Sequence, residues 1–253
     1  MDILPMAALD SNANASRVSE FILPDADTLE AMAEFAAGAG HEINNPLATI
    51  IGRAQLLLKD ERDPQRRQML LSIGAQAYRI RDMIGDAMLF GRPPVPEVQP
   101  VDLANAVAAV VRQQADELAT ESCTVAVDVA TPLVLTADAT QLAIVLTELL
   151  RNSRQALQSV GGGEIQLRAT SCGESAVIEI EDHGHGFTKL ERQHAFDPFF
   201  SGRQAGRGLG FGLSKCWRIV QQHGGRIEIE STPSGATIVR ATWPLARGLS
   251  SQS

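Results

Sequence analysis

The sequence has few aromatic residues, few cysteines and no long apolar run. Aromatic side chains make up 4% of the 253 residues, including one tyrosine and two tryptophans. No stretch approaches the ~18 consecutive apolar residues that a membrane span needs, so we expect no membrane insertion. The N-terminus also lacks the basic and then apolar pattern of a secretory signal. These absences favour a cytoplasmic protein.

Cysteine content and net charge narrow the function classes further. Cys123, Cys172 and Cys216 are odd in number and far apart, without CxxC spacing, so we expect small buried residues in a reducing compartment. The net charge of −8 argues against a nucleic-acid partner or an anionic membrane surface. A hydrophobic content of 44% is enough for the core of one large domain or two modest ones.

Residues 1–24 are weakly patterned and are interpreted as a tail or the remnant of an input region. From Asp25 or Asp27 onward, apolar residues recur at intervals of three and four, which is typical of a long helix packed against others. This stripe comprises Leu29, Met32, Ala36, Ala39, Ile43, Leu47, Ile50, Ala54 and Leu57. It has one stutter, beside Pro46.

A turn over 60–64 and a second apolar stripe over 70–88 predict an antiparallel helical hairpin over residues 25–90. One hairpin cannot bury both stripes well. We therefore expect a homodimer that forms a four-helix bundle. The alternative is a monomeric hairpin that packs on the second domain.

Three prolines within 93–96 predict a linker over 91–100. Residues 101–246 then alternate between helix-like and strand-like patterns, and 247–253 form a tail. We predict helices over 103–118, 138–157 and 209–223, and strands over 124–129, 164–169, 176–181, 226–230 and 237–243. The fold class is therefore α+β, an α/β sandwich with one mixed sheet and helices over one face.

Three features of this second domain together predict a nucleotide site. Glu148 and Asn152 lie at i and i+4 of one helix, so their oxygens could share a hard cation such as Mg²⁺. Alone, such a pair is more often a solvated surface feature. Asp182 ends a strand before Gly184 and Gly186, and its carboxylate is a natural acceptor for an adenine amino group, although a single motif of this kind is usually just a turn.

The third feature is a row of glycines, every second residue over 206–212, that opens a helix and so forms a phosphate cradle. Between it and Asp182, the aromatic segment Phe196–Phe200 precedes a small polar stretch, which predicts a hinge and a mobile lid. Arg203 and Arg207 are candidate phosphate contacts. The order of the motifs predicts a site for ATP with Mg²⁺.

His41 is the candidate nucleophile. It lies between stripe positions Ala39 and Ile43, which directs it away from the bundle axis. A neutral imidazole can attack phosphorus near pH 7. Glu42 is the nearest carboxylate that could fix its tautomer, although adjacent helical residues diverge by about 100°. Asn45, one turn later, could hold a water. From this stretch alone, a surface histidine is the simpler interpretation.

Taken together, these residues resemble the sensor histidine kinases of two-component signalling. His41–Pro46 resembles the phosphoacceptor box of that family. Four further segments resemble boxes of the family and follow its order. Glu148–Ala156 resembles its asparagine box and Phe196–Phe200 its phenylalanine box. Asp182–Gly186 and Gly208–Ser214 resemble its two glycine boxes. The resemblance implies autophosphorylation of His41 from Mg-ATP and transfer to an aspartate of a response regulator receiver domain. The sequence does not show the input, so we expect the signal to come from the N-terminus, from a partner such as a separate sensor or input protein, or from a missing segment.

Carried over by position, His41 is the phosphorylated residue, Glu42 the assisting acid and Asn45 the residue that orients water in a phosphatase reaction. Asn152 matches the Mg²⁺ ligand and Asp182 the adenine contact. The nucleotide set also includes Glu148, Gln155, Gly184, Gly186, Phe187, Arg203, Gly208, Leu209, Gly210, Gly212 and Leu213.

The sequence departs from the family at three places. Glu148 stands where most members have asparagine, and it could ligate the metal, act as a base or do neither. Gln155 replaces a frequently basic residue, and the short lid has Arg203 where the family often has lysine. A clamp-type ATPase, a serine-directed kinase of the same ATP fold and a non-catalytic dimeric scaffold remain alternatives.

Overall fold

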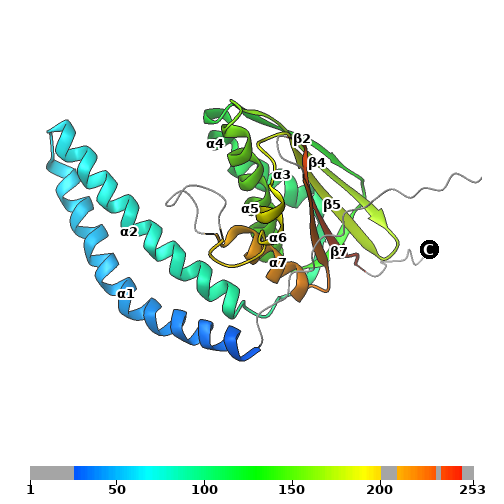
Figure 1. Cartoon of the computed structure of the whole chain (residues 1–253), viewed down its shortest axis with the longest axis horizontal. Coiled ribbons are helices and arrows are strands. Elements are labelled where there is room, and N and C mark those ends of the chain that lie inside the picture. The colour runs from blue at the N-terminus through cyan, green and yellow to red at the C-terminus, as the bar shows by residue number, and fades with distance from the viewer. Residues whose placement is uncertain (1–25, 201–209, 232–234, 247–253) are drawn as a thin grey trace, which may run out of the picture.

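The computed structural model describes residues 26–200, 210–231 and 235–246. Helices α1 (Ala26–Asp60) and α2 (Pro64–Gly91) form the antiparallel hairpin in Figure 1. The Asp63 carboxylate accepts hydrogen bonds from the backbone N–H groups of Gln65 and Arg66, and Pro64 occupies the first helical position, so the turn ends where α2 begins. Helix α1 continues through Pro46. The predicted hairpin and its turn are confirmed.

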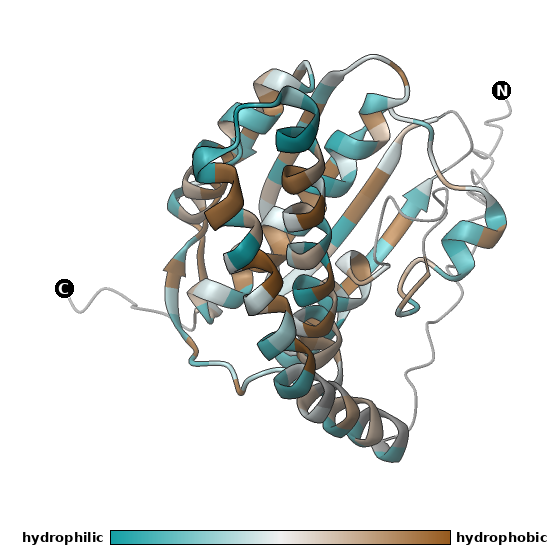
Figure 2. Ribbon diagram, turned by 90° about the vertical axis from the view of Figure 1, so that its left-hand side faces the viewer, coloured by the Kyte–Doolittle hydropathy of each residue, from teal (hydrophilic) through white to brown (hydrophobic). Residues whose placement is uncertain are grey.

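The hairpin has one buried seam and one exposed seam, each with a seven-residue spacing. On α1, every seventh residue is buried against α2: Ala33, Gly40, Leu47 and Ala54. The other part of the predicted stripe stays exposed, with Ile43 at 38%, Ile50 at 43% and Leu57 at 61%. Figure 2 shows apolar residues recurring along both helices. The predicted single stripe is therefore two seams, of which the hairpin itself buries one.

The proline-rich segment after α2 is held by the second domain. Pro94 O accepts a hydrogen bond from Gln141 Nε2 at 3.0 Å, and the Glu97 N–H donates to Asp138 Oδ2 at 3.0 Å. Helix α2 includes Gly91 and strand β1 begins at Gln99, so the predicted linker over 91–100 is wrong for its first residue and its last two.

The second domain is built on a mixed sheet with the strand order β2-β4-β5-β7-β6. Strand β2 runs parallel to β4, and the other neighbours are antiparallel. The strands are β2 (Cys123–Val129), β4 (Gly163–Cys172), β5 (Ser175–Asp182), β6 (Arg226–Ser231) and β7 (Thr237–Pro244). A separate two-stranded sheet pairs β1 (Gln99–Asp102) with β3 (Val134–Ala137).

Helices α3 (Leu103–Gln113), α5 (Ala139–Gln158) and α7 (Gly212–Gln222) cover one face of the sheet (Figure 1). The core lies between these helices and the sheet, and Leu146 of α5, Ile219 of α7 and Trp243 of β7 are fully buried in it. Asp138 caps α5 as its sequence predicts. The predicted α+β class, with helices over one face of a mixed sheet, is confirmed.

Several details differ from the predicted elements. The helix predicted over 103–118 breaks at Gln114 into α3 and α4 (Ala115–Thr120). The helix predicted from residue 209 begins at Gly212, because Gly210 adopts a φ of +71° that no α-helix accommodates. Strand β3 and the five-residue α6 (Lys189–Gln193) were not predicted, since four or five residues carry little periodicity. Cys172 is exposed, so the prediction that all three cysteines are buried is wrong there.

Within the described part of the chain, no helix combines the length and the apolar character that crossing a membrane would require.

Candidate active site

A cavity of about 780 Å³ lies between the second domain and the hairpin. One wall comes from α5, the turn after β5 and the start of α7, and the other comes from α2, through Tyr78, Arg79, Asp82 and Asp86. The volume lies within the range of small-molecule and cofactor sites. The hairpin therefore forms one wall of the cavity, and the second domain forms the other.

Asn152 presents an unsatisfied amide to this cavity. Its Nδ2 atom is buried and has no hydrogen-bond partner among the described residues. Gly212 lies close by, since a Cβ there would stand 3.6 Å from Asn152 Oδ1. A half-turn of the amide exchanges its oxygen and nitrogen, so the oxygen can face a cation. A buried polar group without a partner fits a site whose ligand completes it.

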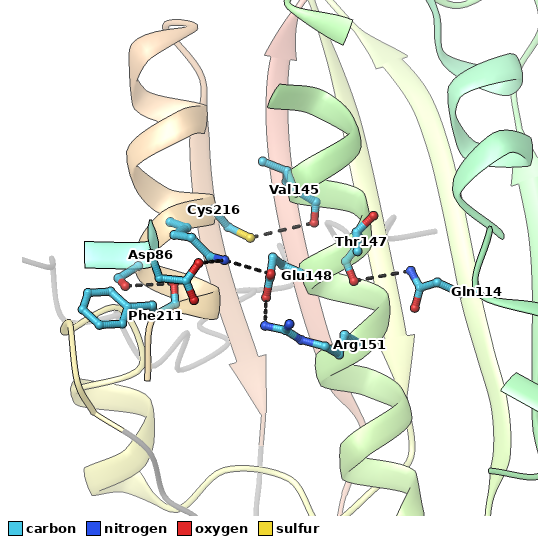
Figure 3. Close-up of polar contacts among 10 residues, drawn as sticks. Asp86, Gln114, Val145, Thr147, Glu148, Arg151, Phe211 and Cys216 are labelled. Atoms are coloured by element: carbon cyan, nitrogen blue, oxygen red, sulfur yellow. Dashed lines mark hydrogen bonds and ion pairs between the residues drawn. The ribbon is translucent and has the colours of Figure 1, made fainter. Parts of the chain in front are cut away.

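Glu148 is held between two cations. Lys215 Nζ lies 3.0 Å from Glu148 Oε1, and the Arg151 guanidinium pairs with Oε2. Figure 3 shows Glu148 with Asp86 and Arg151 on different sides of it. The predicted sharing of one Mg²⁺ by Glu148 and Asn152 stays a prediction, and in this arrangement both Glu148 oxygens already have partners.

Lys215 is buried and charged. Its ammonium also lies 2.6 Å from Asp86 Oδ1 of the hairpin. Burial alone would lower the pKa of Lys215, but the two facing carboxylates, Glu148 and Asp86, outweigh that effect and raise the pKa above its ordinary value. Lys215 therefore stays protonated at neutral pH.

The turn after β5 fixes Asp182 at the cavity wall. Asp182 Oδ1 accepts a hydrogen bond from the Gly184 N–H at 3.0 Å, and burial raises the pKa of its carboxyl group. A Cβ at Gly184 would come within 2.6 Å of the backbone carbon of Ala156, so only glycine fits. Gly186 has a φ of +67°, and the Phe187 N–H donates to Ser231 Oγ. Asp182 and Phe187 line the cavity, whereas the two glycines shape the turn.

The second glycine segment approaches the cavity closely. Gly210, Gly212 and Leu213 line it. A Cβ at Gly210 would stand 2.4 Å from the carbonyl carbon of Phe199, so the backbones touch. Gln155 of α5 also lines the cavity. The predicted contacts Arg203, Arg207, Gly208 and Leu209, together with the predicted lid, lie outside the described residues.

His41 is exposed on α1, as are Glu42 and Asn45. Gly40 of α1 faces Ile84 of α2, and Ala33 faces Gly91, so His41 lies at the level of Met83. The cavity thus meets α2 at the height of His41, because Asp82 and Asp86 line it. None of the described lining residues belongs to α1 itself. The two predicted centres share a level on the hairpin but are not in contact.

Residues outside the sequence motifs complete the cavity. Tyr78 and Arg79 come from α2, Lys215 from α7, and Thr237 and Val239 from β7. Lys215 had a sequence signal, since it is a charged residue among the buried positions of α7. The α2 residues had none, because their role depends on how the hairpin meets the second domain.

Comparisons with known proteins agree with this geometry. Residues 137–247 match the family model of histidine kinase-, DNA gyrase B- and HSP90-like ATPases, and residues 31–94 match the His Kinase A (phospho-acceptor) domain. The sensory histidine kinase/phosphatase NtrB of Escherichia coli O157:H7 is 33% identical over 244 residues, which cover 92% of this chain and 67% of NtrB. The chain belongs to the sensor histidine kinases.

Other histidine kinases match over a smaller share of their length. The signal transduction histidine-protein kinase AtoS of Escherichia coli K12 is 32% identical over 233 residues, 90% of this chain and 37% of AtoS. Sensor histidine kinase ZraS of Klebsiella oxytoca is 31% identical over 82% of this chain and 45% of ZraS. The chain therefore spans less than half the length of these two kinases.

Solved histidine kinase structures share the fold. Full-length ShkA in complex with AMPPNP superposes with a TM-score of 0.73 at 20% identity, over 85% of this chain and 46% of ShkA. The Acinetobacter baumannii histidine kinase AdeS gives a TM-score of 0.60 at 19% identity, over 82% of this chain and 98% of that chain. A hairpin followed by an ATPase-type domain is thus the architecture of this histidine kinase.

Proposed function

We propose that this chain is an ATP-dependent protein-histidine kinase. It binds ATP in the cavity, transfers the γ-phosphoryl group to His41, and passes that group to an aspartate of a response regulator receiver domain. The observation that carries the proposal is the position of the cavity, which abuts α2 at the level of His41. The match of residues 31–94 to the phospho-acceptor domain favours this function over a clamp-type ATPase.

Each wall of the cavity has a role in binding. The Asp182 carboxylate accepts a hydrogen bond from the adenine amino group, and the backbone N–H groups around Gly212, at the N-terminus of α7, receive the phosphates. Asn152 offers the amide oxygen that would hold Mg²⁺. The cation, when bound, would screen the charge of the phosphates. Gln155 and Phe187 complete the pocket.

His41 supplies the nucleophile. One ring nitrogen attacks the γ-phosphorus, the bond to the bridging oxygen breaks, and ADP leaves with the electron pair. Glu42 accepts the proton of the other ring nitrogen, which becomes acidic as the N–P bond forms. Because none of the described residues that line the cavity belongs to α1, the transfer requires the ATPase domain to shift relative to a hairpin. Asn45 lies one turn from His41 and would orient water for dephosphorylation of the regulator.

The exposed seam of the hairpin supports a homodimer. Ile43, Ile50 and Leu57 on α1 are matched on α2 by Ile73 at 49% and Ile80 at 42% exposure. A continuous apolar seam on both helices fits a second copy of the hairpin, which would give a four-helix bundle. A separate input protein is a further proposed partner, and the use of ATP and a response regulator points to the cytoplasm.

The test is incubation of purified protein with γ-labelled ATP and Mg²⁺. We expect acid-labile, base-stable label on the wild type and none on His41→Gln, while His41→Gln still binds nucleotide as the control. Label retained on His41→Gln would overturn the proposal. Steady phosphate release without a phosphoprotein would instead support a clamp-type ATPase, the alternative function with which Glu148 is compatible.

A further inference from the structure

Lys215 joins the two domains through a buried ion-pair cluster. Its Nζ atom lies 2.6 Å from Asp86 Oδ1 on the hairpin and 3.0 Å from Glu148 Oε1 on α5. The three side chains are 7%, 21% and 6% exposed, respectively. Arg151 holds the second Glu148 oxygen. One ammonium is therefore shared between a carboxylate of α5, behind the cavity residue Arg151, and a carboxylate of α2, the helix that walls the cavity.

Such a cluster is sensitive to the loss of one member. A buried ion pair contributes little over an apolar pair of the same shape, but removing one partner leaves an uncompensated charge in a low-dielectric place. Asp86 is the most exposed of the three and can be hydrated when it separates. Glu148 and Lys215 are almost fully buried and pair with each other inside the domain. The contact with Asp86 is therefore the one that can open and close, while the pair inside the domain persists.

A second contact closes the same boundary. Phe90 at the end of α2 is fully buried, and its ring lies 6.4 Å from that of Phe211, which precedes α7. Phe211 also meets Phe199 edge-on at 4.5 Å, and Met32 and Ala87 pack around Phe90 and Phe211. The start of α7 thus contacts the hairpin through an aromatic pair and an ion pair, with Lys215 four residues after Phe211.

We propose that Lys215 is a positioning residue that couples the nucleotide site to the hairpin. It fixes Glu148 against Arg151 and Gly212, which line the cavity, and through Asp86 it holds the ATPase domain against α2. The hairpin then covers one side of the bound nucleotide. When Asp86 separates from Lys215, the nucleotide can exchange. The ATPase domain is then also free to move toward a phosphoacceptor histidine. This coupling rests on the proposed nucleotide site but not on phosphoryl transfer.

The first experiment uses the full chain with the substitution Asp86→Asn, which keeps the shape and removes the charge. The dissociation rate of ribose-labelled fluorescent ADP, chased with unlabelled ADP, should rise about tenfold, because the charged pair that holds α2 on the domain is weakened. Glu34→Gln is the matched control. It removes one negative charge from an exposed side chain at the same end of the hairpin and should change the rate less than twofold. Equal rates in both variants would overturn the proposal.

The second experiment asks whether Asp86 acts through Lys215. Lys215→Met should also accelerate ADP release, and adding Asp86→Asn to it should have less than a twofold further effect. Independent, multiplicative effects of the two substitutions would contradict the coupling. Lys215→Arg keeps both ion pairs and should restore most of the slow release.

Initial rates of autophosphorylation, with kcat taken as the maximal rate constant of labelling per protomer, separate positioning from simple destabilisation. Lys215→Met should raise the KM for ATP severalfold because Glu148 loses its partner, whereas Asp86→Asn should leave KM within about threefold and alter kcat. A parallel change of both constants in both variants would overturn the proposal. If Lys215→Met does not fold, the comparison of Asp86→Asn, Glu34→Gln and Lys215→Arg decides the release test.

The coupling and the kinase activity can fail separately. ADP release is measured in the His41→Gln background, where no phosphoprotein forms. If the effects of the two substitutions on the ADP release rate are non-additive but the wild type carries no phosphoryl label, the coupling is supported and the kinase activity is refuted. Label on His41 with independent release effects would do the opposite. An ADP analogue that does not bind at all would overturn both.

Discussion

Gly212 at the start of α7 lies directly against Glu148 of α5, since a Cβ on Gly212 would stand 2.9 Å from Glu148 Oε2. That oxygen is bound by Arg151, and its partner oxygen is bound by Lys215, so the carboxylate cannot turn away freely. The close approach brings the first backbone amides of α7 next to Asn152. It places the predicted phosphate cradle beside Asn152, the proposed cation ligand on the neighbouring helix.

Gly212→Ala should therefore impair nucleotide binding more than folding. The added methyl group must displace the paired Glu148 carboxylate, so we expect about a tenfold loss of affinity for Mg-ATP with a loss of stability of only ~1 kcal/mol. Isothermal titration and chemical unfolding measure the two effects. An unchanged affinity would show that the cradle is elsewhere.

Gly184→Ala should have the opposite balance. Its methyl group would meet the backbone of Ala156 rather than a side chain, so we expect a destabilisation of about 2–4 kcal/mol in chemical unfolding. Gly38→Ala serves as the control, because Gly38 is an exposed helical residue with open space around it and alanine favours helices there by about 1 kcal/mol. Equal effects of the two substitutions would contradict the packing at Gly184.

Asp182→Asn should stabilise the free protein at neutral pH while weakening nucleotide binding. Burial raises the native pKa of Asp182 above 3.8, so the native state holds its proton more tightly than the unfolded state does. This contribution to stability is present below pH 3.8 and is lost as the pH rises through the native pKa. Unfolding free energies measured from pH 4 to 7 should show the wild type losing stability relative to Asp182→Asn as the pH rises. A parallel pair of curves would refute the raised pKa.

Ile50→Glu should dissociate the proposed dimer. It places a charge at the centre of the exposed seam between Ile43 and Leu57, where a partner hairpin would have to desolvate it. Ala48→Glu, at an exposed position outside that seam, is the matched control and should leave the protein dimeric. Sedimentation equilibrium measures the molecular mass in solution. A wild-type protein that is monomeric at micromolar concentration would contradict the proposed homodimer.

Asn152→Asp should abolish Mg-dependent labelling. An aspartate beside Glu148 adds a second carboxylate where the triphosphate must enter, and like charges there disfavour nucleotide binding. Labelling with γ-labelled ATP over a range of Mg²⁺ concentrations gives the measurement. Normal turnover in this variant would mean that the cation is held elsewhere in the cavity.

The sequence predicts the elements whose signals are local. Apolar periodicity defines the hairpin, Asp138 caps its helix, and the order of the motifs that contain Asn152, Asp182 and Gly212 predicts three walls of one nucleotide site. The fourth wall is a contact between distant segments. Asp86 and Lys215 are 129 residues apart, and nothing in the periodicity of either helix indicates that they meet. Strands β1 and β3 were missed because four residues show too little alternation.

The most direct measurement is the site of phosphorylation itself. Wild-type protein incubated with Mg-ATP and digested at neutral to mildly alkaline pH should give, by tandem mass spectrometry, a single phosphorylated peptide with the phosphoryl group on His41. The Asn152→Asp variant should give none. A phosphoryl group on another residue, or none on wild-type protein that binds ATP, would contradict the assignment of His41 as the phosphoacceptor.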